Sequence, residues 1–361
     1  MPMILILIFV LLIVIFSSSI RPKDGWKDGY ISKEQSRSVE GIFVILIFLG
    51  HVVMCFDSYF ALDYPYLAVK VHLDQAVVAM FLFYSGFGMM QSLQKKGTDY
   101  LKKIPLKRFL PLLIKYEIAT VIYLAVRMII KDIPDKKTLI LSFTGWESLG
   151  NYGWYIFVML SLYVLFCLSF FISHKVHTGR EALTFGALIL TLFSIIFMLL
   201  MCSPGNRERW FYDTVIIFCL GAWYSIFKEK AEAFLSSNLR YMVTCIICLA
   251  VYVITSFSRV FRDMHYLIHE LWMICFTIAV LLITVKISIK SKVLDFFGTL
   301  AFPMLMFQGL PFLIFSYLNL QSSPYLFVLL SFTVTVLLSF TFNKISESFK
   351  RKDNKISQKA S

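Results

Sequence analysis

Charged residues are scarce in this chain, and no part of the sequence stays polar for long. Asp, Glu, Lys and Arg together account for 16% of the 361 residues. The longest hydrophilic stretches, residues 131–152 and 343–361, are too short to bury a core of their own. The period-two alternation of a membrane β-barrel is also missing. These absences exclude a separate soluble domain and an outer-membrane barrel.

The sequence gives little indication of disulfide bonds, a metal site or a nucleic-acid partner. The seven cysteines lie in or beside apolar runs, so we expect them to pack rather than to form a disulfide framework. No set of metal ligands with suitable spacing is present, and no metal site is predicted. The formal charge of +13 would suggest nucleic acid in a soluble protein, but here Lys and Arg lie mainly in short loops between apolar runs. We therefore expect no nucleic-acid partner.

What the chain does have is a series of apolar runs from end to end. Hydrophobic residues make up 58% of it, and a helix that spans a bilayer needs roughly 20 mostly apolar residues. The sequence predicts an all-α, polytopic transmembrane helix bundle of about eleven helices, in contact with membrane lipid. The predicted spans are residues 3–20, 39–56, 75–93, 109–130, 153–173, 182–202, 214–227, 241–257, 270–285, 296–317 and 325–342.

The basic residues assign the sides of the membrane. With the C-terminus in the cytoplasm, the inner segments carry 25 Lys and Arg and the outer loops carry 8. This split obeys the positive-inside rule and predicts a multi-pass protein of the plasma (inner) membrane with its N-terminus outside. Three parts follow: an N-terminal helix and basic loop (1–36), a membrane domain (37–342), and a basic cytoplasmic tail (343–361), expected to be disordered and to contact the inner leaflet.

One histidine lies deep within an apolar span, in RSVEGIFVILIFLGHVVMCF (residues 37–56). Ionisable residues at such depth are usually functional, so His51 is the first candidate. Glu40 precedes it by eleven residues, which returns a helix to within about 20° of the same direction after about 16 Å of rise. Arg37 lies about 40° off that face and one turn from Glu40. Glu40 and His51 are then able to line one polar passage; the alternative is a histidine that bonds a neighbouring helix, with an interfacial Glu–Arg pair.

Several motifs resemble those of the integral-membrane acyltransferase-3 family. EGIFVILIFLGH (40–51) resembles its first core helix, where a basic residue, usually Arg, lies eleven residues before a histidine. FLFYSGFGMM (81–90) resembles its second signature, and KKGTDYLKKIPLKRFLPLLIKY (95–116) its basic cytoplasmic loop. Looser matches are GNYGWYIFVMLSLY (150–163), GNRERWFYDTVIIFCLGAWYS (205–225) and FFGTLAFPMLMFQG (296–309). The resemblance implies a ten-helix core over about residues 37–342, preceded by one extra helix.

The resemblance implies an acyl-CoA-dependent O-acyltransferase. The family moves an acyl group, most often acetyl, from acyl-CoA in the cytoplasm to a hydroxyl of an extracytoplasmic or lipid-linked glycan. Neutral imidazole, with a pKa near about 6.5, suits a base at neutral pH, and His51 is implied as general base or as acyl carrier. Glu40 and Arg37 complete the candidate catalytic set.

Candidate donor-binding residues lie on the inner side. The cations of the loop, Lys102, Lys103, Lys107 and Arg108, are suited to the phosphates of coenzyme A, since Lys and Arg form charge-assisted bonds to phosphate. The alternative is contact with anionic lipid. Ser85, Gly86 and Gly88 interrupt an aromatic helix, and the bare backbone there admits either a thin acyl-pantetheine arm or a neighbouring helix.

Candidate acceptor-binding residues lie on the outer side, ahead of two helices. Aromatic rings beside amides, cations and carboxylates suit a sugar, although an interfacial aromatic belt is the alternative. The first group is Asn151, Tyr152, Trp154 and Tyr155, and the second is Asn206, Arg207, Trp210 and Asp213.

Two positions depart from the family pattern. Glu40 stands where the family usually has Arg, and Gln308, a further acceptor candidate, stands where it often has histidine. A glutamate cannot donate to a phosphate or thioester oxygen as Arg does. Either Arg37 replaces it, or Glu40 acts differently, or activity is altered. A catalytically inactive acyltransferase-like partner is therefore one alternative function. A polytopic transporter of glycans or small molecules is the other, although the inverted repeats expected of one are not visible.

Overall fold

The protein is an all-α bundle, as the sequence predicts. The computed structural model describes residues 3–21, 26, 29–57, 61–73, 75–203, 207–257 and 266–359. The longer elements are α1 (Met3–Ser17), β1 (Ser18–Ile20), α2 (Lys33–Val52), α3 (Tyr64–Leu73), α4 (Ala76–Lys96), α5 (Thr98–Ile104), α6 (Leu110–Ile129), α7 (Lys136–Ser142), α8 (Gly153–Val176), α9 (Gly179–Cys202), α10 (Val215–Leu235), α11 (Asn238–Phe257), α13 (Tyr266–Lys286), β2 (Ile287–Ile289), α14 (Lys292–Thr299), α15 (Ala301–Phe307), α16 (Gly309–Tyr317) and α17 (Pro324–Lys359). Short helical turns occupy Val53–Cys55, Ala61–Asp63, Pro105–Phe109, Arg209–Phe211 and Leu320–Ser322.

The membrane spans agree with the predicted ones except at the N-terminus. Within the described residues, nine helices are long and apolar enough to cross a membrane, or ten when α14 and α15–α16, bent by 57°, count as one span. Helix α1 has only 15 residues, because Ser18–Ile20 leave the helix and pair antiparallel with Ile287–Ile289. The apolar run 3–20 is thus a short helix followed by a strand, not one long span.

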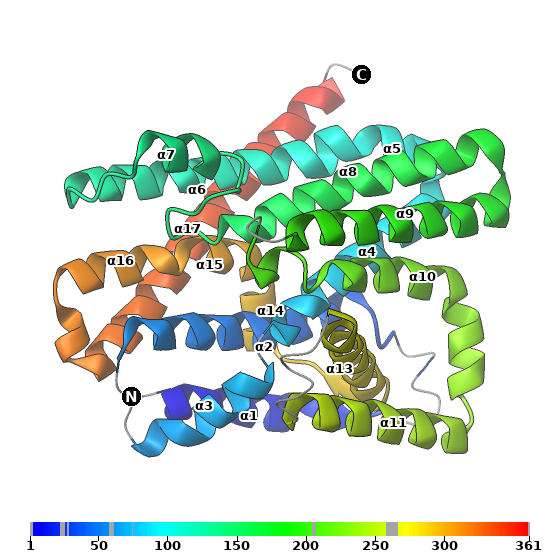
Figure 1. The fold of residues 1–361 in the computed structure, drawn as a ribbon, viewed down its shortest axis with the longest axis horizontal. Coiled ribbons are helices and arrows are strands. Elements are labelled where there is room, and N and C mark those ends of the chain that lie inside the picture. Colours follow the sequence, from blue (N-terminus) through cyan, green and yellow to red (C-terminus); the bar gives the residue numbers. More distant parts are fainter. Residues whose placement is uncertain are drawn as a thin grey trace.

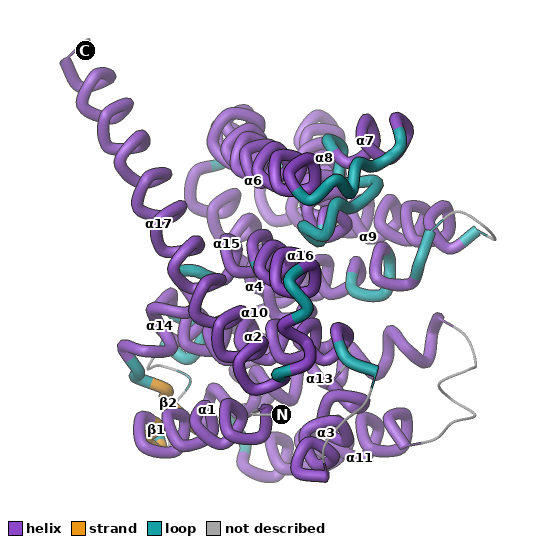
Figure 2. Tube along the Cα trace, turned by 90° about the vertical axis from the view of Figure 1, so that its left-hand side faces the viewer, coloured by secondary structure: helices purple, strands orange, loops and turns teal. Residues whose placement is uncertain are grey.

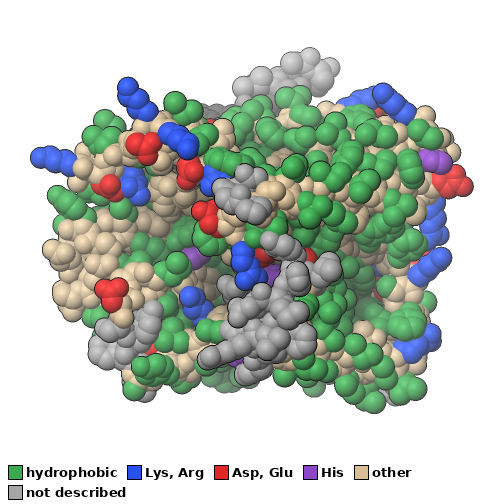
Figure 3. Space-filling model, in the orientation of Figure 1, with side chains coloured by type: hydrophobic (Ala, Val, Ile, Leu, Met, Phe, Trp, Pro, Cys, Tyr) green, Lys and Arg blue, Asp and Glu red, His purple; other side chains and the backbone are tan. Residues whose placement is uncertain are grey.

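Loops that are predicted to lie on opposite sides of the membrane are found at opposite ends of the bundle. In Figure 1 the α8–α9 and α10–α11 turns lie at the right, and the α16–α17 turn lies at the left. Most charged side chains on this face gather towards those two ends, and hydrophobic side chains cover much of the area between them (Figure 3). This distribution is the one expected when the spans run across the view.

The C-terminal tail differs from the prediction. Helix α17 continues from the membrane span to Lys359, through most of the segment expected to be disordered. Viewed from the left-hand side of Figure 1, its C-terminal part leans away from the other helices (Figure 2). A polar, basic sequence is therefore carried as an extension of an apolar helix.

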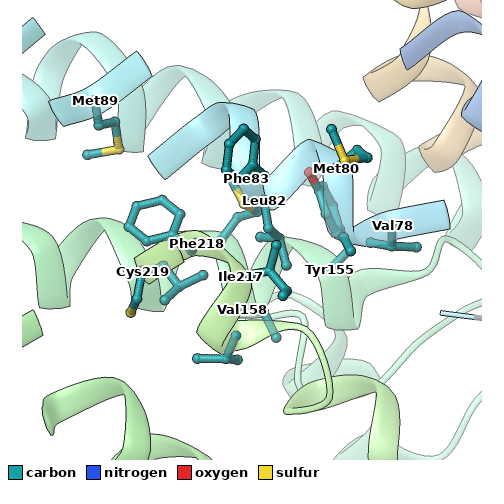
Figure 4. Close-up of a cluster of buried hydrophobic side chains, with 14 of the residues drawn as sticks. Val78, Met80, Leu82, Phe83, Met89, Tyr155, Val158, Ile217, Phe218 and Cys219 are labelled. Atoms are coloured by element: carbon teal, nitrogen blue, oxygen red, sulfur yellow. The ribbon is translucent and has the colours of Figure 1, made fainter. Parts of the chain in front are cut away.

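Helices α4 and α10 pack closely at the Ser-Gly-Phe motif. A Cβ on Gly86 would lie 2.0 Å from the Phe218 carbonyl oxygen, and one on Gly221 would lie 2.2 Å from the Phe83 carbonyl oxygen. Glycine at both positions lets the two backbones touch. Figure 4 shows the side chains that meet around this crossing, with Phe83 of α4 close to Phe218 of α10.

Candidate active site

Helix α2 carries the central residues of the site. It begins where the hydroxyl of Ser32 accepts a hydrogen bond from the Gln35 backbone N–H at 3.3 Å, a normal N-cap. From there it runs without interruption to Val52, and most of its apolar side chains are buried against neighbouring helices. The helical register therefore holds, and Glu40 and His51 both line cavities inside the protein.

His51 lines a cavity of about 470 Å³ at the C-terminal end of α2, called the outer cavity below because charge predicts this end to face outward. Two predicted acceptor residues, Trp154 and Trp210, line the same cavity. The remaining lining comes from the end of α2, from α3, from the start of α4 and from the loop before α8: Leu46, Ile47, Gly50, Met54, Tyr66, Lys70, Leu73, Gln75, Val77, Val78, Ser148 and Tyr152. The cavity is thus rich in aromatic rings, with a few polar groups, which is the usual make-up of a small-molecule site.

The imidazole of His51 is held by an aromatic stack. Its ring centroid lies 4.0 Å from that of Tyr152, with 12° between the planes. The Nδ1 atom is buried and has no hydrogen-bond partner among the described residues. The side chain of Gln308 is close enough to interact with the same imidazole. The contact with Gln308 is the one expected of a histidine that joins two helices, whereas a buried Nδ1 without a partner is the feature expected of a functional one.

Tyr152 reaches His51 because its backbone adopts a left-handed conformation. Its φ is +51° and its ψ is 43°, values that cost a non-glycine residue roughly 1–2 kcal/mol. Such strain persists only where the surroundings fix it, and it often marks a functional site. Burial raises the pKa of the Tyr152 phenol, so the stacked ring is uncharged at neutral pH.

A neighbouring contact fixes the loop that carries Tyr152 and the helix break that carries Gln308. A Cβ on Gly309 would lie 2.1 Å from the Gly150 carbonyl oxygen, so the α15–α16 junction touches the loop before α8. The hydroxyl of Tyr123, on α6, donates to the Met306 carbonyl at 3.0 Å. Two segments far apart in sequence thereby meet beside His51.

Glu40 lines a second, smaller cavity of about 200 Å³ on the inner side. Predicted residue Tyr155 lines this inner cavity, not the outer one. Ile47 and Val78 line both cavities and so form their common wall. In place of the single polar passage predicted between Glu40 and His51, the structure has two cavities that adjoin at Ile47 and Val78.

Arg37 points elsewhere. Its guanidinium lies 3.7 Å from the carboxylate of Asp295, on α14. The two helices cross in contact here, since a Cβ on Gly298 would lie 2.0 Å from the Arg37 carbonyl oxygen. Arg37 lines neither of the two cavities, so it does not take the place that the family gives to Arg.

The predicted donor-binding residues lie apart from both cavities. Lys102, Lys103 and Lys107 are exposed, and Arg108 is half-buried over the ring of Tyr100. Lys102 also lies 3.5 Å from Asp99. All four cations are thus at the surface, a place that suits either a diphosphate or a lipid headgroup.

The Ser85–Gly86 region is explained mainly by packing. The close approach that Gly86 permits is made by the backbone of α10. The Ser85 hydroxyl is buried and has no hydrogen-bond partner among the described residues. Of the two alternatives that the sequence left open, the neighbouring helix is the one that occupies Gly86.

The other acceptor candidates are mostly engaged in holding the outer loops. The Asn151 amide donates to Thr120 Oγ1 at 2.9 Å. Arg207 pairs with Glu147 at 3.0 Å, with its guanidinium 4.0 Å from the Trp146 ring centroid.

The last two members of this set are Asp213 and Asn206. Asp213 lies 3.2 Å from Arg209 and 3.6 Å from His269. Asn206 lies outside the described residues.

Sequence reasoning missed Lys70 and the role of Tyr152. Lys70 counted only as a charge on an outer loop, and nothing in its neighbourhood, YLAVKVHL, signals a cavity. Tyr152 was grouped with sugar-binding aromatics, whereas its ring stacks on His51. Both contacts depend on how separate segments fold together.

Comparisons with known proteins give one match. A family model described as an acyltransferase domain covers residues 38–344. No curated protein and no solved structure matches the chain. Among the described residues, no group of three His, Cys, Asp or Glu side chains is arranged to hold a metal ion.

Proposed function

This chain belongs to the membrane acyltransferase-3 family, and we propose that it transfers an acyl group, most often acetyl, from cytoplasmic acyl-CoA to a hydroxyl of an extracytoplasmic or lipid-linked glycan. One observation carries the proposal: a stacked histidine lines an aromatic outer cavity, and Ile47 and Val78 line both this cavity and the inner one. Such an arrangement suits a reaction whose two substrates arrive from opposite sides.

His51 acts as the general base in this proposal. Its free imidazole nitrogen takes the proton of the acceptor hydroxyl as that oxygen attacks the thioester carbonyl. The tetrahedral intermediate then collapses, the carbon–sulfur bond breaks, and the imidazolium returns the proton to the thiolate. An ester and free coenzyme A are the products. Tyr152 and Gln308 hold the imidazole in the orientation that this proton transfer requires.

In this proposal the acyl-CoA donor enters through the inner cavity, which is narrow and has few polar groups. Glu40 is the one acidic residue, and no Lys, Arg or His is found, among the described residues that line the inner cavity. This lining offers phosphates no cation, so the coenzyme A phosphates stay at the surface, where Lys102, Lys103, Lys107 and Arg108 lie. Only the uncharged acyl-pantetheine end enters the bundle and displaces Ile47 or Val78 to reach His51.

The test is acyl incorporation from radiolabelled acetyl-CoA in membranes that contain wild-type protein, His51→Ala or His51→Gln. We expect both variants to lose transfer by 100-fold or more while the protein is present at normal levels, because base catalysis contributes roughly 10²–10⁴-fold. Half-buried His177, which follows α8 and lines neither cavity, supplies the matched control, and His177→Gln is expected to be fully active. Full activity in His51→Gln would refute the mechanism.

A second measurement separates the base mechanism from an acyl-histidine. Protein is mixed with labelled acetyl-CoA without acceptor, and the denatured chain is then counted. We expect no label on the protein, because a base holds only a proton. Label that depends on His51 would instead show an acyl carrier.

The same assay distinguishes an active acyltransferase from a catalytically inactive relative. The substitutions at Glu40 and Gln308 favour that alternative, since both remove groups that the family usually has. Wild-type protein that binds acetyl-CoA but transfers nothing to any membrane glycan would establish it.

A further inference from the structure

Lys70 is the one residue with a full positive charge among the described residues that line the outer cavity, and none of the described lining residues is acidic. It belongs to α3 and is half-buried. Its side chain lies beside α2, since a Cβ on Gly50 would be in ordinary van der Waals contact with Lys70 Cε, at 3.7 Å. Gly50 directly precedes His51, and the Lys70 ammonium is close enough to act electrostatically on the imidazole.

No described acidic side chain forms an ion pair with Lys70. A half-buried ammonium has lost part of its hydration, and this loss is offset when an anion takes up the charge. The position is therefore suited to an anion that enters the cavity from outside.

The remaining lining indicates what carries that anion. Trp154, Trp210 and Tyr66 present flat apolar surfaces, and Gln75 and Ser148 present hydrogen-bonding groups. Proteins commonly bind a sugar by stacking aromatic rings on its apolar face and by hydrogen bonds from amide side chains to its hydroxyls. Lys70 lines the outer cavity but not the inner one, so it lies on the acceptor side of the Ile47–Val78 wall.

We propose that the acceptor is an acidic sugar, whose carboxylate or phosphate binds Lys70 while a neighbouring hydroxyl faces His51. This inference rests on the proposed function, since it names the substrate class of the same site. Lys70 is then a specificity-determining residue: it binds a group that does not react and sets which hydroxyl meets the base.

The test is a binding measurement that needs no acyl transfer. Saturation-transfer NMR titrations in uncharged detergent compare p-nitrophenyl β-glucoside, its 6-phosphate and p-nitrophenyl β-glucuronide. These three probes differ only at carbon 6, and the two charged arms distinguish phosphate from carboxylate. We expect at least one charged probe to bind about tenfold more tightly than the neutral one, since a hydrogen bond to a charged group is worth about one to two kcal/mol more than a neutral bond. Added salt should narrow the difference.

Variants assign the preference to Lys70. In Lys70→Met we expect the three probes to bind equally, and in Lys70→Arg the preference for the anion should persist. Lys136→Met is the matched control, because Lys136 is an exposed lysine of α7 that does not line the cavity, and its preference should equal the wild-type one. Equal binding of all probes to wild-type protein, or an anion preference that survives in Lys70→Met, would overturn the inference.

Transfer to the same probes then separates the two proposals. If wild-type protein prefers the anionic probes but transfers no acetyl group to them or to any glycan, the proposed function fails, and only the binding of an acidic sugar at Lys70 stands. If Lys70→Met slows transfer to neutral and anionic probes by the same factor, Lys70 acts on the reacting carbonyl and the inference fails.

Discussion

Substitution of Tyr152 tests whether the stack on His51 is functional and whether its backbone is strained. Two energies are involved at this residue. An aromatic pair at a centroid distance of 4.0 Å contributes about 0.5–1.5 kcal/mol beyond burial, which corresponds to roughly a 2- to 13-fold effect on how often the imidazole is correctly oriented. The left-handed backbone costs a residue with a Cβ about 1–2 kcal/mol, and glycine avoids that cost.

Three variants separate these energies. Tyr152→Phe keeps the ring, and the phenol is uncharged at neutral pH, so we expect activity close to wild type. Tyr152→Ala and Tyr152→Gly both lose the ring and should lose activity by the same 2- to 13-fold factor. Their stabilities should differ, with the glycine variant more stable than the alanine variant by about 0.5–1 kcal/mol, because the relief of strain exceeds the entropic cost of glycine in the unfolded chain.

The assays are labelled acetyl transfer at saturating donor and thermal unfolding in detergent. Glycine normally destabilises relative to alanine, so the reversed order is a specific signature of a positive φ. An alanine variant more stable than the glycine variant would refute the strain argument. Wild-type activity in Tyr152→Ala would refute the stack.

The remaining predictions concern the inner side of the protein. Gly86→Ala should destabilise the protein by roughly 1–3 kcal/mol in thermal unfolding, since its Cβ would meet the Phe218 carbonyl oxygen, whereas Gly88→Ala, whose Cβ meets nothing within 4 Å, should not. Equal melting temperatures for these two variants would contradict packing at Gly86. Replacing both Lys107 and Arg108 with glutamine should raise the KM for acyl-CoA several-fold and leave the KM for the acceptor unchanged. Each hydrogen bond from a charged side chain to phosphate is worth about 1.5–3 kcal/mol, and solvent at an exposed site reduces this value. An unchanged donor KM would assign this surface to lipid contact.

The local features of α2 could be predicted from the sequence, and its surroundings could not. Helical periodicity alone placed Glu40 and His51 on one face, and both do line cavities. Periodicity says nothing of what lies between them on other helices, so the wall made by Ile47 with Val78 of α4 was not foreseen. Lys70 and Gln308 approach His51 through α3 and the α15–α16 junction, contacts that span many residues in sequence.

Two errors of prediction have the same physical source. The run 3–20 is apolar enough for a span, but backbone pairing with β2 ends the helix at Ser17, and no hydropathy scale contains that pairing. The tail beyond residue 342 is polar and basic, yet it follows an unbroken helix and continues it. In each case the state of a segment depends on what precedes or pairs with it, more than on its own composition.

The two cavities explain how this chain can have Glu40 where the family usually has Arg. An arginine at this position would offer a positive charge, whereas Glu40 offers none. Arg37 does not compensate, since Asp295 holds it at the α2–α14 crossing. The inner cavity therefore suits a ligand that hydrogen-bonds to a carboxyl group and carries no negative charge where it passes Glu40. The pantetheine arm, with its amide N–H groups, has that chemistry, whereas the phosphates do not. The departure from the family pattern is thus compatible with an acyl-CoA donor, provided that its charged end remains at the surface.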